Sequence, residues 1–503
     1  MTAVGSVDPR TGETVEQVAQ ETTEEAVDAI CQAALAAYPL LEAMGRDGRA
    51  RMLRAMADAL DGDRAEIVRL ADRETALGET RLNGELTRTA FQLRLFAEVL
   101  LDGGYLEATI DHPGDTAMGP RPDLRRMLIP VGPVGVFGAS NFPLAFSVPG
   151  GDTASALAAG CPAVIKAHPA HPATSQRTFE RLLDGARAAG APDGTVSLVH
   201  GQAAGGVLVR HPAIRAVGFT GSLRGGRALF DIASARPDPI PFYGELGSLN
   251  PLVVTPAAAA ERGAEIAAGY LGSVTMGVGQ FCTKPGLAFV PAGATELTAA
   301  LAEATAAAPA GWMLSGGIRD AFEAGSAAMR EQAGVSELAT STASPDGGFS
   351  AVPRLVRVAA SDLDGPLLEE CFGPTAVVAE YADENELLAT LGRLEGALTA
   401  TLHIGDGETD LPRRVAESLS RRAGRVIYNA YPTGVAVTWA MHHGGPWPAT
   451  TSELHTSVGT TAIRRFLRPI SFQGAPQALL PEELRDGKTG IPRRIDGTLT
   501  LDS

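Results

Sequence analysis

The chain has 503 residues, of which 45% are hydrophobic and 20% charged, a composition typical of a folded protein with two to four domains. Its 58 acidic and 42 basic side chains give a formal net charge of −16, which argues against nucleic acid or an anionic membrane as the main partner. Four scattered cysteines without a CxxC pair, no long uncharged apolar run, and a polar N-terminal segment together favour a reduced, cytoplasmic protein without a disulfide framework, zinc site or membrane span.

The first part of the chain is predicted to be helical. Apolar residues recur at three- and four-residue spacing over 24–100, whereas Pro113, Pro120 and Pro122 indicate an extended excursion over 108–127. From residue 128, short β-branched runs alternate with helical stretches, which predicts βαβ units and a parallel sheet. The predicted strands lie in MLIPVGPVGVFG, PAVIKAH, TVSLVHG and AIRAVGFTG.

A second α/β set begins near residue 250, with strands expected in PLVVT, GLAFV, RLVRV, TAVVAEY and GRVIYNA. We therefore expect a dinucleotide-binding domain from 1–107 and 128–244, and a catalytic domain from 245–464. The excursion at 108–127 and the Pro-rich tail at 465–503 are expected to form an oligomerisation element. An extended arm of this kind usually adds to a partner's sheet, so we expect a homodimer or homotetramer.

Three segments contain residues suited to catalysis. VGQFCTKPG places Cys282 on a glycine-rich loop, FYGELGSLNP places Glu245 between two glycines, and VFGASNFPLAF places Asn141 at the end of a predicted strand. A thiol can act as a nucleophile, a carboxylate as a general base, and an amide as a donor to an oxyanion. Taken singly, each has an ordinary interpretation: an inert core cysteine, a capping glutamate and a turn asparagine.

The order of these segments changes the interpretation. NFP, then GELG, then QFC, over a region from about 5 to 490, resembles the aldehyde dehydrogenase superfamily. That resemblance implies two parallel-sheet α/β domains plus a small oligomerisation arm. Three further segments match: PAVIKAHPA, GFTGSLRGG and ECFGP, which carry Lys166, Gly221, Ser222, Gly226, Glu370 and Phe372.

The resemblance implies a role for each residue. Cys282 would attack the aldehyde as a thiolate, with its pKa depressed by loop dipoles, and Asn141 would hold the oxyanion. After hydride transfer, Glu245 would activate the water that hydrolyses the thioester. Lys166 and Glu370 would bind ribose hydroxyls, Phe372 would pack near the nicotinamide, and Ser222 with Gly221 and Gly226 would meet the pyrophosphate at a helix N-terminus.

Two alternatives to a hydrolytic enzyme are less favoured. Relatives that pass the acyl group to coenzyme A do not need a water-activating glutamate, and Glu245 is present. A non-catalytic, structural relative would be expected to have lost the cysteine or the base, and this chain has both. A free carboxylic acid is therefore the expected product.

The cofactor is predicted to be NADP in preference to NAD, with both used. NAD-preferring relatives commonly carry a glutamate three residues after the cofactor lysine, and here that position is Pro169. Without a carboxylate there is no charge repulsion against a 2′-phosphate. His168 or Lys166 is expected to contribute to cofactor binding, and no metal is expected.

The stretches GGDTASALAAGCPAVIKAHPAHPATS and AMHHGGPWPATTSELHTSVG narrow the resemblance. They are similar to the 2,5-dioxovalerate (α-ketoglutaric semialdehyde) dehydrogenase branch, which also contains NADP-dependent fatty aldehyde dehydrogenases. The expected substrate is 2-oxoglutarate semialdehyde, with medium- or long-chain aldehydes as the alternative. Wall residues of the aldehyde tunnel are expected at Phe146, Phe281, His443 and Trp447. A charged semialdehyde also needs a cationic group, and the sequence does not say which arginine supplies it.

Overall fold

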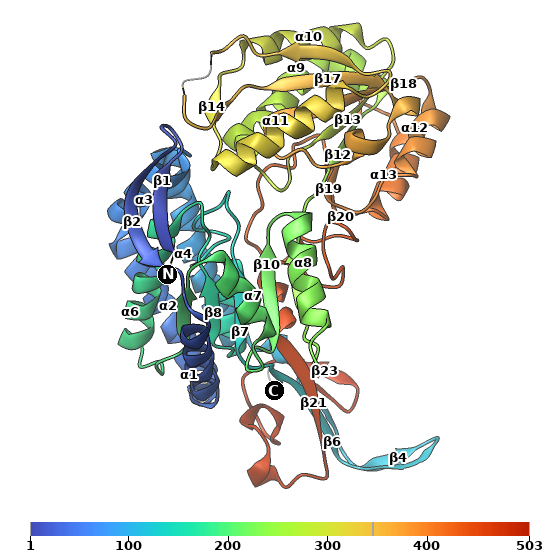
Figure 1. Cartoon of the computed structure of the whole chain (residues 1–503). Coiled ribbons are helices and arrows are strands. Elements are labelled where there is room, and N and C mark those ends of the chain that lie inside the picture. Colours follow the sequence, from blue (N-terminus) through green and yellow to red (C-terminus); the bar gives the residue numbers. More distant parts are fainter. Residues whose placement is uncertain (1, 345–346, 502–503) are drawn as a thin grey trace.

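The computed structural model describes residues 2–344 and 347–501, and three sheets organise this part of the chain (Figure 1). Helices cover both faces of the first and second sheets described below (Figure 1). The α-helices are α1 (Glu24–Ala43), α2 (Gly45–Gly62), α3 (Arg64–Thr75), α4 (Glu79–Asp102), α5 (Gly151–Ala159), α6 (Pro172–Ala188), α7 (Gln202–Arg210), α8 (Leu223–Ser234), α9 (Pro256–Thr275), α10 (Thr295–Ala307), α11 (Gly316–Arg330), α12 (Glu384–Leu391) and α13 (Asp410–Ser420).

The first sheet has five parallel strands in the order β11-β10-β7-β8-β9. The strands β8 and β9 follow β7 on one side of it, and β10 and β11 then lie on its other side. Ligands bind such sheets at the carboxyl ends of the strands where this order reverses, here between β7 and β10. The strands are β7 (Val134–Phe137), β8 (Ala163–Lys166), β9 (Val196–Val199), β10 (Ala216–Thr220) and β11 (Phe242–Glu245).

This sheet is buried on both faces, and its side chains alternate between two cores. Ala163 and Ile165 of β8 pack with α2, α4, α5 and α6, while Val164 packs with α1 and α7. Burial on both faces explains why the strands appear in the sequence as continuous apolar runs. The predicted parallel sheet of βαβ units is confirmed, and β11 is an additional strand that the sequence did not predict.

The second sheet has seven strands in the order β15-β17-β18-β13-β12-β19-β20, parallel except for the edge strand β15. All five strands predicted after residue 250 are present. The sequence analysis missed β15 and β19; in β19, threonines interrupt the apolar run although every residue is buried. The strands are β12 (Pro251–Val254), β13 (Leu287–Pro291), β15 (Ser336–Thr340), β17 (Arg354–Ala359), β18 (Thr375–Tyr381), β19 (Ala397–His403) and β20 (Ala423–Tyr428).

The third sheet brings together the excursion and the tail, which are far apart in sequence, in the order β21-β6-β3-β22-β23. It extends from the base of the molecule beside the hairpin of β4 (Gly114–Thr116) and β5 (Gly119–Arg121) (Figure 1). Its edge strands expose backbone groups. Its strands are β3 (Thr109–Asp111), β6 (Leu124–Pro130), β21 (Leu467–Gln473), β22 (Arg493–Ile495) and β23 (Thr498–Thr500).

The predicted fold class of two parallel-sheet α/β units with a smaller arm is confirmed. The sheets fall on either side of the predicted divisions, except that β6 continues past residue 127 to Pro130 and β11 continues past residue 244 to Glu245. The domain limits themselves stay a prediction. The N-terminal hairpin of β1 (Ala3–Asp8) and β2 (Glu13–Gln20) was not predicted.

One described helix, α1, is long and apolar enough to span a membrane by length and composition alone, which is weak support for a span. The sequence analysis did not identify it because charged residues lie near its start. Val27, Cys31 and Ala34 on its inner side belong to the core shared with α7. α1 therefore buries one face against this core, and most of its other residues stay partly or fully exposed.

Candidate active site

Glu245 is the last residue of β11, and a distant segment of the chain runs beside it. Thr450 forms an antiparallel bridge with Glu245, and the Leu246 N–H donates to the Ala449 carbonyl at 2.8 Å. These backbone bonds anchor the loop HGGPWPATT against the end of the first sheet. His443, at the start of that loop, thereby comes to lie beside a carboxylate 198 residues earlier in the chain.

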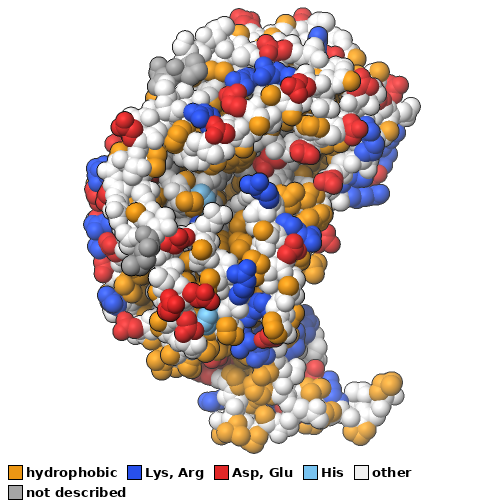
Figure 2. All heavy atoms as spheres, viewed as in Figure 1, with side chains coloured by type: hydrophobic (Ala, Val, Ile, Leu, Met, Phe, Trp, Pro, Cys, Tyr) orange, Lys and Arg blue, Asp and Glu red, His pale blue; other side chains and the backbone are white. Residues whose placement is uncertain are grey.

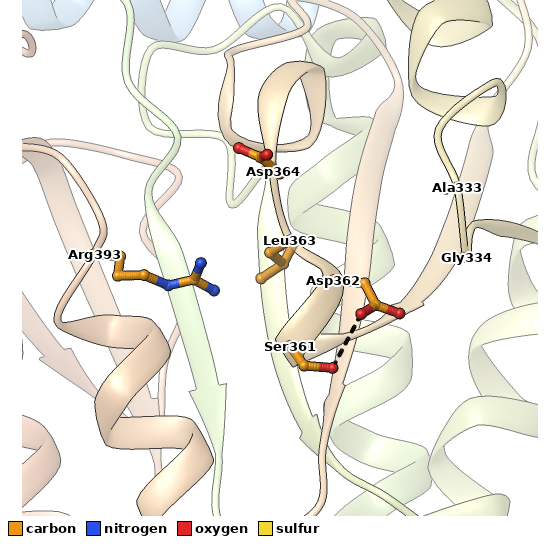
Figure 3. A pocket seen from close by; sticks show the side chains of 7 residues that line it. All are labelled: Ala333, Gly334, Ser361, Asp362, Leu363, Asp364 and Arg393. Carbon is orange, nitrogen blue, oxygen red and sulfur yellow. Dashed lines mark hydrogen bonds between the residues drawn. The ribbon is translucent and has the colours of Figure 1, made fainter.

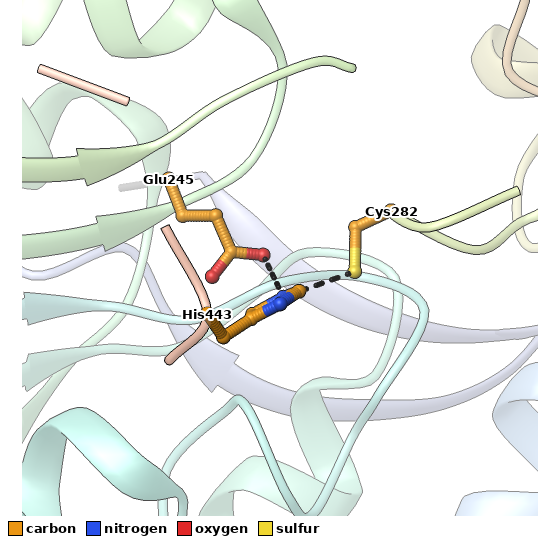
Figure 4. Close-up of side chains that lie close together, drawn as sticks. All are labelled: Glu245, Cys282 and His443. Atoms are coloured by element: carbon orange, nitrogen blue, oxygen red, sulfur yellow. Dashed lines mark hydrogen bonds and ion pairs between the residues drawn. The ribbon is translucent and has the colours of Figure 1, made fainter. Parts of the chain in front are cut away.

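Glu245, Cys282 and His443 form a compact cluster, with one ligand atom from each within 4.8 Å of the others (Figure 4). His443 Nε2 lies 3.0 Å from Glu245 Oε1 and 3.6 Å from Cys282 Sγ. The Ser457 hydroxyl donates to the other carboxylate oxygen. Glu245 and His443 are almost completely buried, while Cys282 is partly exposed.

The contacts shift the pKa values of the Glu245 carboxyl and the Cys282 thiol in opposite directions. Burial by itself raises the pKa of Glu245, but the charge and hydrogen bond of His443, with hydrogen bonds from Ser457 and Cys282, lower it overall. The pKa of Cys282 lies well above its ordinary value because of burial and the negative charges of Glu245 and Glu370. The expectation of a depressed Cys282 pKa is therefore wrong for this arrangement, since burial and the adjacent carboxylates outweigh the loop dipoles.

His443 Nε2 faces both neighbours, and one nitrogen carries either a proton or a lone pair. It therefore donates to the carboxylate or accepts from the thiol, but not both at once. The cluster as it stands is a resting state. The thiol is protonated and the carboxylate is charged and held by three donors.

Hydrogen bonds from Asn250 and Lys284 hold the loop that carries Cys282 in place. Asn250 Nδ2 donates to the carbonyls of Cys282 and Lys284 at 2.8 and 3.0 Å. The buried Lys284 ammonium donates to the carbonyls of Cys371, Gly373 and Thr375. These bonds tie the nucleophile loop to the segment that carries Glu370 and Phe372.

Asn141 lies at the carboxyl end of β7, where its Nδ2 donates to the Gln280 carbonyl at 2.8 Å. The amide therefore reaches the Cys282 loop, as its predicted oxyanion role requires. Arg81 holds the loop of Asn141 in place by donating to its backbone carbonyl at 2.7 Å. The Arg81 guanidinium packs against the rings of Phe142 and Phe281, 5.0 and 4.7 Å from their centroids.

A cleft of about 1380 Å³ opens beside Cys282. Figure 2 shows a hollow on this face between the upper and lower parts of the molecule, with basic side chains along it. The cleft runs over the carboxyl ends of β7, β10 and β11, the position expected for a nucleotide. The predicted residues that line it are Asn141, His168, Gly221, Ser222, Glu245, Cys282, Glu370, Phe372 and Trp447.

Two residues of the predicted phosphate turn have different roles, because Ser222 lines the cleft and Gly226 does not. Ser222 is the N-cap of α8, and its side chain accepts from the Gly225 N–H at 3.2 Å. The free N–H groups of this first turn face the cleft and suit a phosphate. Gly226 does not line the cleft. A Cβ there would lie 2.1 Å from Leu246, so this glycine permits close packing between α8 and β11.

The other cofactor residues differ in charge from what was expected. Burial lowers the pKa of His168 well below its ordinary value, with the charges of His171 and Lys166 acting in the same direction. His168 is therefore a neutral donor and does not supply a positive charge. Burial lowers the pKa of Lys166 to about 8, and Lys166 lies outside the cleft lining. Burial raises the pKa of Glu370 to about 7.

The aromatic residues predicted for the aldehyde tunnel fall in two places. Phe146 and Phe281 pack edge-on against Phe142, with centroids 5.2 and 5.0 Å apart, and Phe146 lies 6.3 Å from the His443 ring. Trp447 does not join them. It is 48% exposed in the nucleotide cleft, where the Arg227 guanidinium lies 5.8 Å from its ring. Its place in the aldehyde wall stays a prediction, since the cleft that it lines also reaches Asn141 and Cys282.

A second hollow, of about 500 Å³, lies in the catalytic unit (Figure 3). Asp362, Asp364 and Arg393 line it, and Arg393 also lines the main cleft. None of the predicted catalytic or cofactor residues lies there.

The sequence did not reveal three features of the site. His443 was expected to be a tunnel wall residue and instead contacts both catalytic groups. Ser457 gave no signal, since its partner is 212 residues away. Arg224 and Arg227 line the cleft at the start of α8, and the spacing SLRGGR was the signal that could have identified them.

Fold and site together define a two-unit α/β protein with a thiol, a carboxylate and an imidazole at the edge of a dinucleotide-sized cleft. The aldehyde dehydrogenase family profile matches residues 2–468, so the chain belongs to the aldehyde dehydrogenase family, whose members use NAD or NADP.

Two relatives match nearly the whole chain. One is alpha-ketoglutaric semialdehyde dehydrogenase 2 of Azospirillum brasilense, 46% identical over 97% of this chain and 95% of that protein. The other is the alpha-ketoglutaric semialdehyde dehydrogenase of Acinetobacter baylyi, 43% identical over 95% and 92%. Among solved structures, aldehyde dehydrogenase C of Pseudomonas syringae, complexed with NAD+ and octanal, covers 94% of both chains with a TM-score of 0.79 and 22% identity, which supports the fold.

Proposed function

We propose that this enzyme oxidises 2-oxoglutarate semialdehyde (2,5-dioxopentanoate) to 2-oxoglutarate, with NADP or NAD as the hydride acceptor. The observation that carries the proposal is the cluster of Cys282, His443 and Glu245 at the edge of the cleft. The names of the two relatives at 46% and 43% identity support the choice of substrate.

The residues divide the chemistry between two steps. The Cys282 thiol gives its proton to His443 Nε2, 3.6 Å away, as its sulfur bonds to the aldehyde carbon, and the Asn141 amide stabilises the negative oxygen that results. When bound, the nicotinamide supplies the acceptor for the hydride that leaves this carbon. Cys282 then holds the acyl group as a thioester.

Glu245 acts in the second step. Its carboxylate takes a proton from a water molecule as the water oxygen bonds to the thioester carbon and the sulfur leaves. The donors from His443 and Ser457 keep the carboxylate ionised despite its burial. A buried, charged base beside the acyl carrier favours water as the acceptor over coenzyme A.

The cofactor proposal favours NADP, with NAD also used. No carboxylate follows Lys166 at position 169, and Arg224 and Arg227 line the cleft next to the first turn of α8. Guanidinium groups bind phosphate well because they present several donors in one plane. Since His168 is neutral, the two arginines are the better source of positive charge for a 2′-phosphate.

We also propose a cytoplasmic homodimer or homotetramer. The third sheet supports association because both of its edges are open and large apolar side chains nearby are exposed, including Met118, Leu479 and Leu499. Light scattering of the full chain tests this. A monomer at micromolar concentration would contradict it.

A kinetic panel tests the reaction and its substrate. With 2-oxoglutarate semialdehyde, succinic semialdehyde and decanal, each with NADP and NAD, the first aldehyde should give the highest kcat/KM. Cys282→Ala should abolish cofactor reduction, and undiminished activity would overturn the mechanism. The phenylalanine cluster around Phe142 supports the second candidate, oxidation of medium- or long-chain aldehydes. A clear preference for decanal would decide for it.

A further inference from the structure

Arg88 is a cation near the catalytic groups with no carboxylate partner. It lies on α4, and its guanidinium is 4.9 Å from the centroid of the Phe146 ring. Among described residues, no acidic oxygen lies within the 4.0 Å of an ion pair. Its hydrogen bonds are long: 3.3 and 3.4 Å to the Val435 carbonyl and 3.4 Å to Gln92 Oε1. These donors are available for a better acceptor.

The environment of Arg88 places it within electrostatic reach of the reacting atoms. Burial lowers the pKa of Arg88, while the negative charges of Glu85, Cys282 and Glu245 raise it. The Phe146 ring over which it lies belongs to the aromatic cluster next to His443. The cation is thus on the aromatic side of Cys282, and Arg88 does not line the nucleotide cleft.

Arg425 approaches from the other unit. It lies on β20 and donates to the Pro432 and Gly434 carbonyls at 2.8 and 3.2 Å. Its Nε is buried with no hydrogen-bond partner, and the charge of Cys282 raises its pKa against burial. Arg88 and Arg425 therefore both contact the segment 432–435, and the charge of an ionised Cys282 raises the pKa of each.

Two buried arginines elsewhere in the fold do have carboxylate partners, whereas Arg49 and Arg236 bond only carbonyl or hydroxyl oxygens among the described residues. Arg465 pairs with Asp152 at 2.8 Å, and Arg125 pairs with Asp123 and Asp486 at 2.9 and 2.8 Å. Partly desolvated guanidinium groups without an anion retain strong unused affinity for a carboxylate. Near Cys282 two guanidinium groups have no described carboxylate within ion-pair distance, although Glu85 and Glu245 act on Arg88 from farther away.

We propose that Arg88, assisted by Arg425, binds the carboxylate at the far end of the substrate and sets the preference for semialdehydes of carboxylic acids over neutral aldehydes. This rests on the proposed function. Four carbon–carbon bonds separate the aldehyde carbon from the carboxylate carbon of 2-oxoglutarate semialdehyde. The carboxylate therefore stays near Cys282 when the aldehyde carbon is bonded to sulfur, on the side where the aromatic cluster and the two arginines lie. The rings accommodate the methylene carbons between the two ends.

The test compares charged and neutral aldehydes of equal carbon number. We would measure kcat/KM for 2-oxoglutarate semialdehyde against pentanal, and for succinic semialdehyde against butanal. The enzymes are the wild type, Arg88→Gln, Arg88→Lys, Arg425→Gln and a control, Arg94→Gln. Arg94 lies on the same helix but faces solvent and pairs with Asp58 and Asp61.

In Arg88→Gln, the charged-to-neutral ratio should fall by about 10- to 100-fold, the size of a lost charge-assisted hydrogen bond. Arg425→Gln should lower the ratio less, Arg88→Lys should restore part of it, and Arg94→Gln should leave it unchanged. An equal loss for charged and neutral substrates in Arg88→Gln would show that Arg88 only holds the Val435 segment, and would overturn the proposal.

The two pairs separate this proposal from the proposed function. If the wild type prefers succinic semialdehyde to butanal and Arg88→Gln removes that preference, the arginine site stands even where 2-oxoglutarate semialdehyde is a poor substrate. If the wild type prefers 2-oxoglutarate semialdehyde and Arg88→Gln keeps that preference, the substrate stands and the arginine site is wrong. Unfolding temperatures of the variants, compared with Arg94→Gln, show whether each is folded, and the lysine variant tests the site if the glutamine variant is not.

Discussion

Replacing Glu245 by glutamine should have opposite effects on the two chemical steps. The charge of Glu245 and its hydrogen bond with Cys282 raise the pKa of the thiol. Removing the charge while keeping the shape of the side chain should therefore lower the Cys282 pKa. The same change removes the base that activates water.

The size of the first effect follows from the geometry. The Cys282 sulfur and a carboxylate oxygen of Glu245 lie within 4.8 Å of each other. Two unit charges at that distance interact by roughly 1 to 3.5 kcal/mol for effective dielectric constants from about 80 to 20. Removing this repulsion lowers the Cys282 pKa. The thiolate fraction near neutral pH rises accordingly, while each thiolate becomes a weaker nucleophile as its pKa falls. The net alkylation rate should rise by about 2- to 20-fold.

The assay is iodoacetamide alkylation of Cys282 in Glu245→Gln and the wild type between pH 6 and pH 9. Glu261→Gln serves as the control, because Glu261 is exposed on α9. The curve of alkylation rate against pH should move to lower pH in Glu245→Gln only. Mixing this variant with aldehyde and cofactor should give a burst of reduced cofactor equal to the enzyme present. Turnover afterwards should be slower by about 100-fold or more, as expected for loss of a general base.

Slower alkylation of Glu245→Gln at every pH would refute the reasoning. It would mean that Glu245 mainly accepts the thiol proton and promotes ionisation, so that its charge is not the dominant cause of the high thiol pKa. Undiminished steady-state turnover would separately refute the assignment of Glu245 as the water base.

The remaining predictions concern His443, Pro169 and the metal-binding potential of the cluster. In His443→Asn, the Glu245 pKa should rise because burial is no longer offset by the imidazole, so the acid limb of thioester hydrolysis should move to higher pH in single-turnover profiles; an unchanged limb would contradict the pKa assignment. Pro169→Glu should lower kcat/KM for NADP by about 10- to 100-fold through repulsion of the 2′-phosphate and leave NAD within about threefold, whereas equal losses for both cofactors would count against the placement. Zn²⁺ should inhibit reversibly, since thiolate, imidazole and carboxylate are its ordinary ligands and lie within 4.8 Å of one another here; EDTA should restore activity, and equal inhibition of His443→Asn would exclude this site.

The sequence by itself determined the parts of this protein that depend on local pattern. Continuous apolar runs between helical periods predicted most strands of both parallel sheets, because strands covered on both faces have no polar side. Asn141 follows from the same pattern because it comes just after a predicted strand, whereas Glu245 ends the unpredicted strand β11 and was identified only from the family segment GELG. The short family segments around Cys282 identified this residue as the nucleophile without any knowledge of distances in space.

Only the tertiary structure decided what depends on contacts between distant segments. His443 is brought to Glu245 by a backbone bridge across roughly two hundred residues, and its partner Ser457 has no local signature. The pKa of Cys282 is raised by burial and by carboxylates from two other segments, so the loop sequence alone gave the wrong direction. Arg88 and Arg425 come from opposite units, and their lack of carboxylate partners is visible only when all neighbours are in place. Electrostatic energies and hydrogen bonds depend on distance in space, and distance along the chain does not fix it.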